Sequence, residues 1–126
     1  MDSIFIEKLR VDTIIGVYPN ERVTKQPLII DINISYDTAQ AMASDNLKYA
    51  LDYHQVCKDV HVFVSESSYH LIETLAECIA QNILKIDGVL EVKIRLSKPN
   101  ALDLAENVGI CIHRKNETHA NSRVAD

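Results

Sequence analysis

The middle and the end of the chain alternate apolar and polar residues with the period of a β-strand. The alternation is clean in residues 28–37, where apolar and polar side chains would fall on opposite faces: Ile30, Ile32, Ile34 and Tyr36 against Asp31, Asn33 and Ser35. A period of two with one apolar face is typical of a half-buried antiparallel strand. The same period returns at Leu90–Ser97 and at Val108–Ile112, so the pattern predicts three such strands.

The first segment has the same period with one interruption. From Phe5 to Tyr18 apolar residues fall on alternate positions, whereas Ile4 and Ile6 have the opposite phase; the alternating residues are Leu9, Val11, Ile15 and Val17. One extra residue in a strand reverses the phase of the side chains beyond it, as in a β-bulge. The sequence therefore predicts a strand from Phe5 to Tyr18 with a bulge near Glu7.

Between these strands the apolar residues follow the helical period instead. Residues 52–65 show this spacing and residues 71–83 show it more strongly, at Val56, Val60, Phe63 and Val64 and then at Leu71, Ile72, Leu75, Ala76, Ile79, Ala80 and Ile83. A polar break at Ser65–Ser68 separates the two segments. Two consecutive amphipathic helices are predicted.

The resulting order of elements is β-β-α-α-β-β. Strands, then helices, then strands favour an α+β domain in which two helices cover one face of a four-stranded antiparallel sheet. One domain is expected at residues 1–116. The remaining residues, 117–126, lose all periodicity and are rich in polar and charged side chains, so we expect a disordered tail without function.

Composition and charge narrow the classes of partner. The 126 residues carry a net charge of −5, and their Lys and Arg residues are scattered rather than clustered. A phosphate backbone or an anionic membrane surface would require a basic patch, so neither nucleic acid nor membrane is an expected partner. Residues 1–12 contain acidic residues and alternate with period two, unlike a signal peptide, and a cytoplasmic location is expected.

The spacing of cysteines and histidines does not indicate a metal site or a disulfide framework. The three cysteines are widely spaced among apolar residues, and we expect them to be buried and inert: Cys57, Cys78 and Cys111. The histidines that could be considered as zinc ligands do not match any known ligand spacing: His54, His61 and His70. No metal is expected.

Four short segments carry the strongest signal about function. They are Ile15-Gly16-Val17-Tyr18 followed by Glu21, Leu51-Asp52-Tyr53, Leu71-Ile72-Glu73, and Leu96-Ser97-Lys98-Pro99 leading to Asn107-Val108-Gly109. Each is weak alone, but their order, spacing and placement on the predicted elements agree. Together they span nearly the whole chain except the tail, and the chain resembles the dihydroneopterin aldolase family.

The resemblance implies a fold, an assembly and a reaction. The family has the tunnelling fold, in which four subunits join their sheets into a barrel and two rings stack into a homo-octamer, with active sites between neighbouring subunits. Its members act in folate synthesis and split 7,8-dihydroneopterin into 6-hydroxymethyl-7,8-dihydropterin and glycolaldehyde by a retro-aldol reaction. Epimerisation of the side chain is a side activity. Because the dihydropterin ring provides the electron sink, no cofactor or metal is expected.

The resemblance also assigns roles to the pterin-binding residues. Glu73 would accept paired hydrogen bonds from the amino group and a ring N–H of the pterin, and main-chain groups near Ile72 would complete that recognition. A plainer interpretation is available for Glu73. A carboxylate in the first turn of a helix is stabilised by the helix dipole and could complete a capping arrangement with His70.

Three further residues are assigned to the reacting side chain of the substrate. Lys98 would carry the proton, Glu21 would contact the side-chain hydroxyls and pair with Lys98, and Tyr53 would pack on the pterin and reach the hydroxyls. Without the resemblance, Lys98 is a surface lysine at a strand end, Glu21 a loop carboxylate and Tyr53 a half-buried aromatic. The role of Lys98 depends on partial burial and charged neighbours, which spacing along the chain does not show.

Two alternatives remain open. A dihydroneopterin triphosphate epimerase has the same fold and similar motifs, but it would have to bind a triphosphate. Arg22 and Lys25 are the only cations near Glu21, and the sequence has no glycine-rich phosphate loop. The other alternative is a non-catalytic binding module for pterins or other small molecules, in which Glu73 only caps a helix and Lys98 is only a surface charge.

Overall fold

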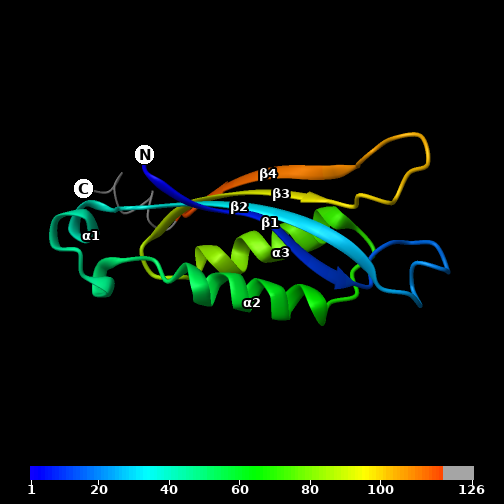
Figure 1. Cartoon of the computed structure of the whole chain (residues 1–126), viewed down its shortest axis with the longest axis horizontal. Helices are drawn as coiled ribbons and strands as arrows, with labels where there is room; N and C mark the ends of the chain where they lie inside the picture. The colour runs from blue at the N-terminus through cyan, green and yellow to red at the C-terminus, as the bar shows by residue number, and fades with distance from the viewer. Residues whose placement is uncertain (118–126) are drawn as a thin grey trace.

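The computed structural model describes residues 1–117, and the predicted tail at 117–126 therefore lies outside the described residues apart from Glu117. The elements run along the chain as shown in Figure 1. They are β1 (Ser3–Thr13), β2 (Gln26–Tyr36), α1 (Ala39–Ser44), the 3-10 helix η1 (Leu47–Tyr49), α2 (Tyr53–Ser65), α3 (Ile72–Leu84), β3 (Val89–Ser97) and β4 (Gly109–Lys115).

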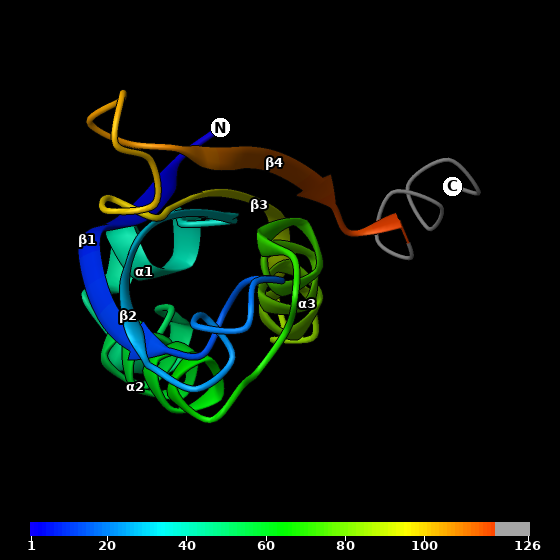
Figure 2. The ribbon, with the colours of Figure 1, turned by 90° about the vertical axis from the view of Figure 1, so that its right-hand side faces the viewer.

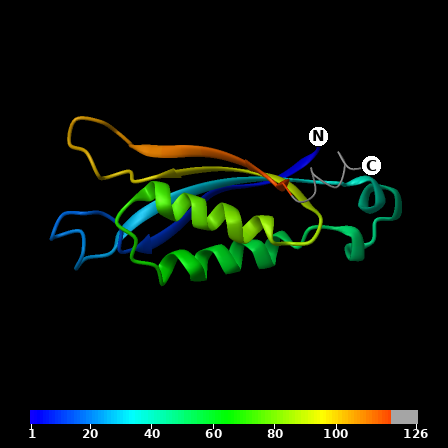
Figure 3. The same ribbon diagram turned by 180° about the vertical axis from the view of Figure 1, so that it is seen from behind.

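The four strands form one antiparallel sheet in the order β1-β2-β3-β4. Helices α2 and α3 lie on the same face of this sheet, as Figures 1 and 3 show from opposite sides. Helix α2 packs against β1, and α3 packs against β3 and β4. The predicted α+β architecture, a four-stranded antiparallel sheet with two helices on one face, is confirmed.

The core lies between the sheet and the two helices. In β2 the alternate residues that face the helices are at most 1% exposed: Leu28, Ile30, Ile32 and Ile34. Ile32 pairs with Ile94 of β3, and Ile94 pairs with Ile112 of β4, so one apolar row crosses three strands. Helix α3 covers this row with side chains at helical spacing: Leu75, Ile79 and Ile83. The apolar faces that the strand period and the helical period define in the sequence pack against each other at this interface.

Strand β1 contains the predicted bulge but ends earlier than predicted. Its register with β2 shifts between Ile6 and Leu9, and Lys8 has the left-handed φ of 54°. The predicted end at Tyr18 is wrong, because pairing stops at Thr13. The buried Thr13 hydroxyl donates a hydrogen bond of 2.6 Å to the carbonyl oxygen of Val64, near the end of α2.

Two smaller expectations are also corrected. Helix α1 and η1, between β2 and α2, were not predicted because they contain no buried residue, and an exposed helix leaves no apolar period. Cys57 and Cys78 are half-buried, but Cys111 is exposed, because alternation along β4 places it on the face away from the helices. Within residues 1–117, no helix is long and apolar enough to cross a membrane.

Three connections meet at one end of the sheet, which faces the viewer in Figure 2. They are the β1–β2 connection (residues 14–25), the α2–α3 connection (residues 66–71) and the β3–β4 connection (residues 98–108). Helix α2 points its last residue toward this end and its first residue, Tyr53, away from it (Figure 1). The length of α2, 13 residues or about 20 Å, separates Tyr53 from this end.

Candidate active site

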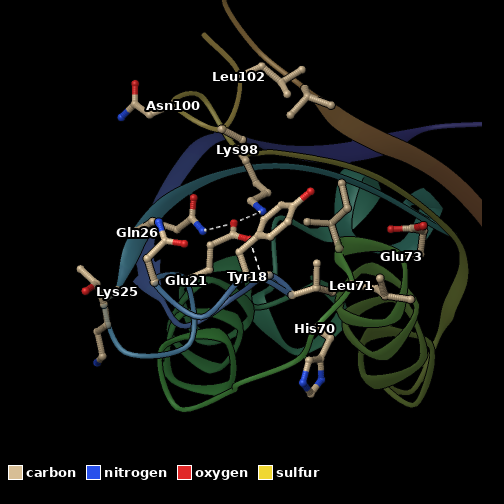
Figure 4. A pocket seen from close by; sticks show the side chains of 17 residues that line it. Tyr18, Glu21, Lys25, Gln26, His70, Leu71, Glu73, Lys98, Asn100 and Leu102 are labelled. Atoms are coloured by element: carbon tan, nitrogen blue, oxygen red, sulfur yellow. Dashed lines mark hydrogen bonds and ion pairs between the residues drawn. The ribbon is translucent and has the colours of Figure 1, made fainter.

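A pocket of about 510 Å³ lies where the three connections meet. Figure 4 shows its lining side chains. The β1–β2 connection, the start of α3 and the end of β3 with its following loop each contribute to its wall; the main contributors are Tyr18, Glu21, Leu71, Ile72, Glu73 and Lys98. The pocket therefore joins segments that are far apart in the sequence.

An ion pair occupies one side of this pocket. The Nζ atom of Lys98 lies 2.9 Å from Oε2 of Glu21, and the two side chains are only 13% and 17% exposed. Lys98 is fixed from its main chain as well, because its N–H donates to the carbonyl of Val108 at 2.7 Å. The structure thus confirms the predicted pairing of Glu21 with Lys98, and the lysine is not a free surface charge.

Glu21 is held as a charged carboxylate. It accepts hydrogen bonds from Gln26 Nε2 at 3.1 Å and from the Tyr18 N–H at 3.3 Å, in addition to the bond from Lys98. The Lys98 ammonium is the main cause that lowers the pKa of Glu21 from 4.5 to about 2. Because the folded state lowers this pKa, the pair stabilises the fold above pH 4.5, and that contribution is lost as pH falls toward 2.

Two glycines allow close approaches in the walls around this pair. Gly16 has a φ of +128°, and a Cβ at this position would collide with the Glu21 carboxyl group. Gly109 allows β4 to approach β3 closely, since a Cβ there would collide with the Leu96 carbonyl oxygen. Only glycine combines this backbone freedom with the absence of a side chain. Both motif glycines therefore position the walls next to Glu21 and Lys98.

The start of α3 forms the other side of the pocket. Its N-cap, Leu71, has extended backbone angles and provides no side-chain cap, and the first helical hydrogen bond runs from the Leu75 N–H to the Leu71 carbonyl at 3.2 Å. The N–H groups of Ile72 and Glu73 precede that bond and can bind a ligand. Helix α2, in contrast, is capped by Asp52, whose carboxylate accepts from the Gln55 N–H at 3.1 Å.

Glu73 lies on this uncapped side, across the pocket from the Glu21–Lys98 pair (Figure 4). The interpretation of Glu73 as part of a capping arrangement with His70 is wrong, because the N-cap is Leu71 and no side chain caps this helix. Its carboxylate is exposed and makes no hydrogen bond or ion pair with the rest of residues 1–117. A carboxylate without a partner can accept hydrogen bonds from a ligand, and the neighbouring free N–H groups can donate to it. Together they can bind the edge of a ligand that carries both donors and an acceptor.

The structure brings together four of the five predicted site residues in one chain. Glu21, Lys98, Ile72 and Glu73 line the same pocket, but Tyr53 does not. Tyr53 is 49% exposed at the opposite end of α2. The single chain therefore holds four of these residues in one pocket, without Tyr53.

The sequence did not reveal the contacts of two residues close to Glu21 along the chain. Gln26 links Glu21 to the Ile15 carbonyl, to which its Nε2 also donates at 2.8 Å. Arg22, which the sequence suggested only as a phosphate-binding cation, donates to main-chain carbonyls instead: Gly16 at 3.0 Å, Tyr69 at 3.1 Å and Ser68 at 2.6 Å. Two of those acceptors lie 46 and 47 residues away in sequence, so spacing could not reveal the contacts.

Side chains that bind metal ions do not cluster in the described part of the chain. Within residues 1–117, no three His, Cys, Asp or Glu side chains lie together in a way that could hold a metal ion. His70 lines the pocket, whereas His54 and His61 lie on α2 beside Tyr53. The charged groups that line the pocket are thus the ammoniums of Lys98 and Lys25 and the carboxylates of Glu21 and Glu73, beside the amide groups of a helix start.

The sheet with two helices on one face and the pocket at its loop end define a tunnelling-fold protein. A urate oxidase from Bacillus sp. TB-90 shares the fold but is only 8% identical in sequence. The two structures superpose with a TM-score of 0.62, covering 91% of this chain and 45% of the other. Within this class, the chain belongs to the dihydroneopterin aldolase family, whose model matches residues 4–113.

Individual relatives agree with this assignment. The chain is 38% identical to dihydroneopterin aldolase of Escherichia coli K12 over 122 residues, which cover 97% of this chain and all of the relative. The crystal structure of the E. coli enzyme in complex with neopterin superposes with a TM-score of 0.86, covering 90% of this chain and 99% of that one. A dihydroneopterin triphosphate 2'-epimerase of Pseudomonas aeruginosa is 30% identical over 112 residues, 89% of this chain and 91% of the relative.

Proposed function

We propose that the protein is a carbon–carbon lyase of folate synthesis that splits 7,8-dihydroneopterin into 6-hydroxymethyl-7,8-dihydropterin and glycolaldehyde. The observation that carries this proposal is the pocket itself, with a ligand-binding helix start and Glu73 on one side and the Glu21–Lys98 pair on the other. A non-catalytic binding module would not need the half-buried ion pair. The neopterin complex of the 38% identical E. coli relative supports a pterin as the ligand.

The pterin ring binds at the start of α3. Glu73 accepts hydrogen bonds from the exocyclic amino group and the neighbouring ring N–H, and the N–H of Ile72 donates to a ring acceptor. Charge-assisted bonds of this kind are stronger than neutral ones and fix the orientation of a planar ligand. The hydroxylated side chain of the substrate then extends toward Glu21 and Lys98.

Lys98 carries the proton that the cleavage requires. In its amine form it takes the proton of the middle side-chain hydroxyl, which is on the carbon that becomes the aldehyde, and the Glu21 carboxylate stabilises the resulting ammonium. The electrons of the breaking carbon–carbon bond move into the carbon–nitrogen double bond of the dihydropterin ring, whose nitrogen gains a proton. Glycolaldehyde leaves, and protonation of the remaining enamine carbon with loss of the ring N–H proton gives the product. If the enamine carbon instead adds back to the opposite face of the aldehyde carbonyl, the epimer of the substrate forms.

The contacts of Arg22 favour this aldolase over a triphosphate epimerase. Arg22 is one of the two cations that the sequence offered for a triphosphate, and its guanidinium already donates to three main-chain carbonyls. Binding phosphate through Arg22 would break these three hydrogen bonds, which costs free energy. Lys25 would remain alone against the charge of a triphosphate. We therefore expect dihydroneopterin to be the better substrate.

Cleavage should proceed without a metal ion or a Schiff base. Purified enzyme treated with a chelator should convert dihydroneopterin at its original rate, and borohydride added with substrate should not inactivate it, because the dihydropterin ring accepts the electrons. The fluorescence of the pterin product and an independent assay for glycolaldehyde measure the rate. Activity that disappears with chelator and returns with zinc would contradict the mechanism, and the absence of glycolaldehyde from untreated enzyme would contradict the proposed function.

The assembly proposed for the chain is a homo-octamer of two tetrameric rings with active sites between subunits. The sheet has open edges at β1 and β4, and natural proteins usually pair or protect such edges. Tyr53 is remote from the pocket of its own subunit, so the proposal places the Tyr53 of a neighbouring subunit at the site. There it packs on the pterin and approaches the reacting hydroxyls.

Mixed oligomers should test this assembly. Tyr53→Ala and Lys98→Ala proteins should each be nearly inactive. Random co-assembly of equal amounts should restore about a quarter of the wild-type activity, because about one site in four then receives an intact Tyr53 from one variant and an intact Lys98 from the other. Light scattering should report the mass of eight chains for each variant. A monomeric mass would rule out the octamer, and mixtures that stay inactive would rule out a shared site.

A further inference from the structure

We propose that Arg22 is a positioning residue that sets the spacing between the two sides of the active-site pocket. Its guanidinium links the β1–β2 connection, which carries Glu21, to the α2–α3 connection, which leads into Ile72 and Glu73. The inference rests on the proposed function, because the two sides act on different parts of one substrate. The family motifs in the sequence do not assign any role to Arg22.

The contacts of Arg22 span the two segments. Nη1 donates to the carbonyl of Gly16 at 3.0 Å within the first connection and to the carbonyl of Tyr69 at 3.1 Å within the second. Nη2 donates to the carbonyl of Ser68 at 2.6 Å. A planar guanidinium holds these donors in a fixed fork, so its three acceptors are held in a fixed arrangement as well.

Few other hydrogen bonds join the two segments directly. Between residues 14–25 and residues 66–71, all within the described part of the chain, the remaining hydrogen bond runs from the Gly16 N–H to the Tyr69 carbonyl at 3.4 Å. Thr13, at the end of β1, contacts the Ser67 carbonyl at 3.0 Å, but it precedes the loop that carries Glu21. Arg22 thus provides most of the direct polar link between the two sides.

The main chain of Arg22 strengthens its effect on Glu21. The N–H groups of Glu21 and Arg22 both donate to the carbonyl of Tyr18, at 2.9 and 3.2 Å, and so form one tight turn. Glu21 immediately precedes Arg22, and the two side chains point to different partners, Lys98 and the carbonyls of the second connection. A displacement of the guanidinium therefore moves the turn that carries Glu21 relative to Ile72 and Glu73.

No acidic partner explains the presence of a charge at this position. Among residues 1–117, Arg22 makes no ion pair with a carboxylate. The nearest carboxylate in sequence, Glu21, pairs with Lys98 instead. The acceptors of Arg22 are main-chain carbonyls. A forked guanidinium matches several such acceptors better than the single ammonium of a lysine does.

The inference makes a specific kinetic prediction for Arg22→Met, which keeps the length of the side chain and removes its donors. Each side of the pocket stays intact in this variant, but their relative placement is lost. Pterin itself, which has the recognised ring edge and no side chain, should bind as it does to the wild type. Turnover of dihydroneopterin should fall at least about tenfold, because a displacement near 1 Å between reacting groups is enough for losses of this size or larger.

The experiment compares Arg22→Met and Arg22→Gln with wild type, measuring pterin affinity by fluorescence, single-turnover cleavage, oligomer mass and thermal unfolding. Arg22→Gln retains one amide donor and should recover part of the lost turnover; it is also the variant to measure if Arg22→Met does not fold. Arg10→Met is the matched control, because Arg10 lies on the exposed side of β1 and its side chain, among residues 1–117, forms an ion pair only with Asp12, at 3.6 Å. It should leave turnover unchanged.

The possible results distinguish a failure of the positioning role of Arg22 from a failure of the proposed function. Inactive wild-type enzyme would refute the proposed function. With active wild type, normal turnover in Arg22→Met would overturn the positioning role. Loss of pterin affinity in parallel with turnover, at equal oligomer mass, would overturn it too, because Arg22 would then act on the binding side alone. Equal turnover in Arg22→Gln and Arg22→Met would show that the hydrogen bonds to the carbonyls do not set the spacing.

Discussion

Replacing Lys98 by alanine should lower the turnover of dihydroneopterin at least about a hundredfold, the lower scale of general acid–base catalysis, while pterin remains bound. The affinity should persist because Glu73 and the N–H groups at the start of α3 bind the ring on the other side of the pocket. A mutation that removes only a proton carrier lowers the rate of the chemical step more than it weakens binding. Cleavage and epimerisation should fall together, since both begin with the same deprotonation.

Single-turnover kinetics and pterin fluorescence measure the two effects separately. Lys93→Ala is the matched control, because Lys93 lies on the same strand but is exposed on the face away from the helices. It should change neither quantity. Thermal unfolding must also be compared, because Lys98→Ala leaves the half-buried Glu21 without its ammonium partner. Near-normal cleavage in Lys98→Ala would show that Tyr53, Glu21 or a water molecule carries the proton.

Replacing Glu73 by alanine should abolish measurable pterin binding rather than only slow the reaction. The change removes two charge-assisted hydrogen bonds, and a loss of about 3 kcal/mol corresponds to roughly a hundredfold in affinity. The free energy of unfolding should change by less than about 1 kcal/mol, the usual contribution of an exposed carboxylate to the helix dipole. Glu73 does not cap α3 through its side chain, so a larger effect on stability is not expected.

Product affinity measured by fluorescence titration is the deciding quantity for Glu73. Glu73→Gln keeps the shape of the side chain and removes its charge, so it should bind pterin more weakly than wild type. Glu66→Ala is a suitable control, because Glu66 is an exposed carboxylate at the end of α2 and does not line the pocket. Unchanged affinity in Glu73→Ala would mean that the ring is recognised by the main-chain groups alone.

The regular elements could be predicted from the sequence because their burial is periodic. Ile30, Ile32 and Ile34 face the helices at every second residue, and Leu75, Ile79 and Ile83 face the sheet at helical spacing. The bulge in β1 was visible as a reversal of phase. Helix α1, without a buried residue, left no such pattern, and the early end of β1 at Thr13 was hidden because Ile15 is also buried although it lies beyond the strand.

The sequence by itself determined the architecture, the family resemblance and the residue types of the site, because short motifs and periodic burial are local properties of a chain. Only the tertiary structure decided which of those residues meet. It brought Glu21 within 2.9 Å of Lys98, 77 positions away, separated Tyr53 from both, and directed Arg22 to main-chain carbonyls instead of a ligand. Every residue offers a carbonyl acceptor, so such contacts leave no signature in the sequence, and the folded loops alone select among them.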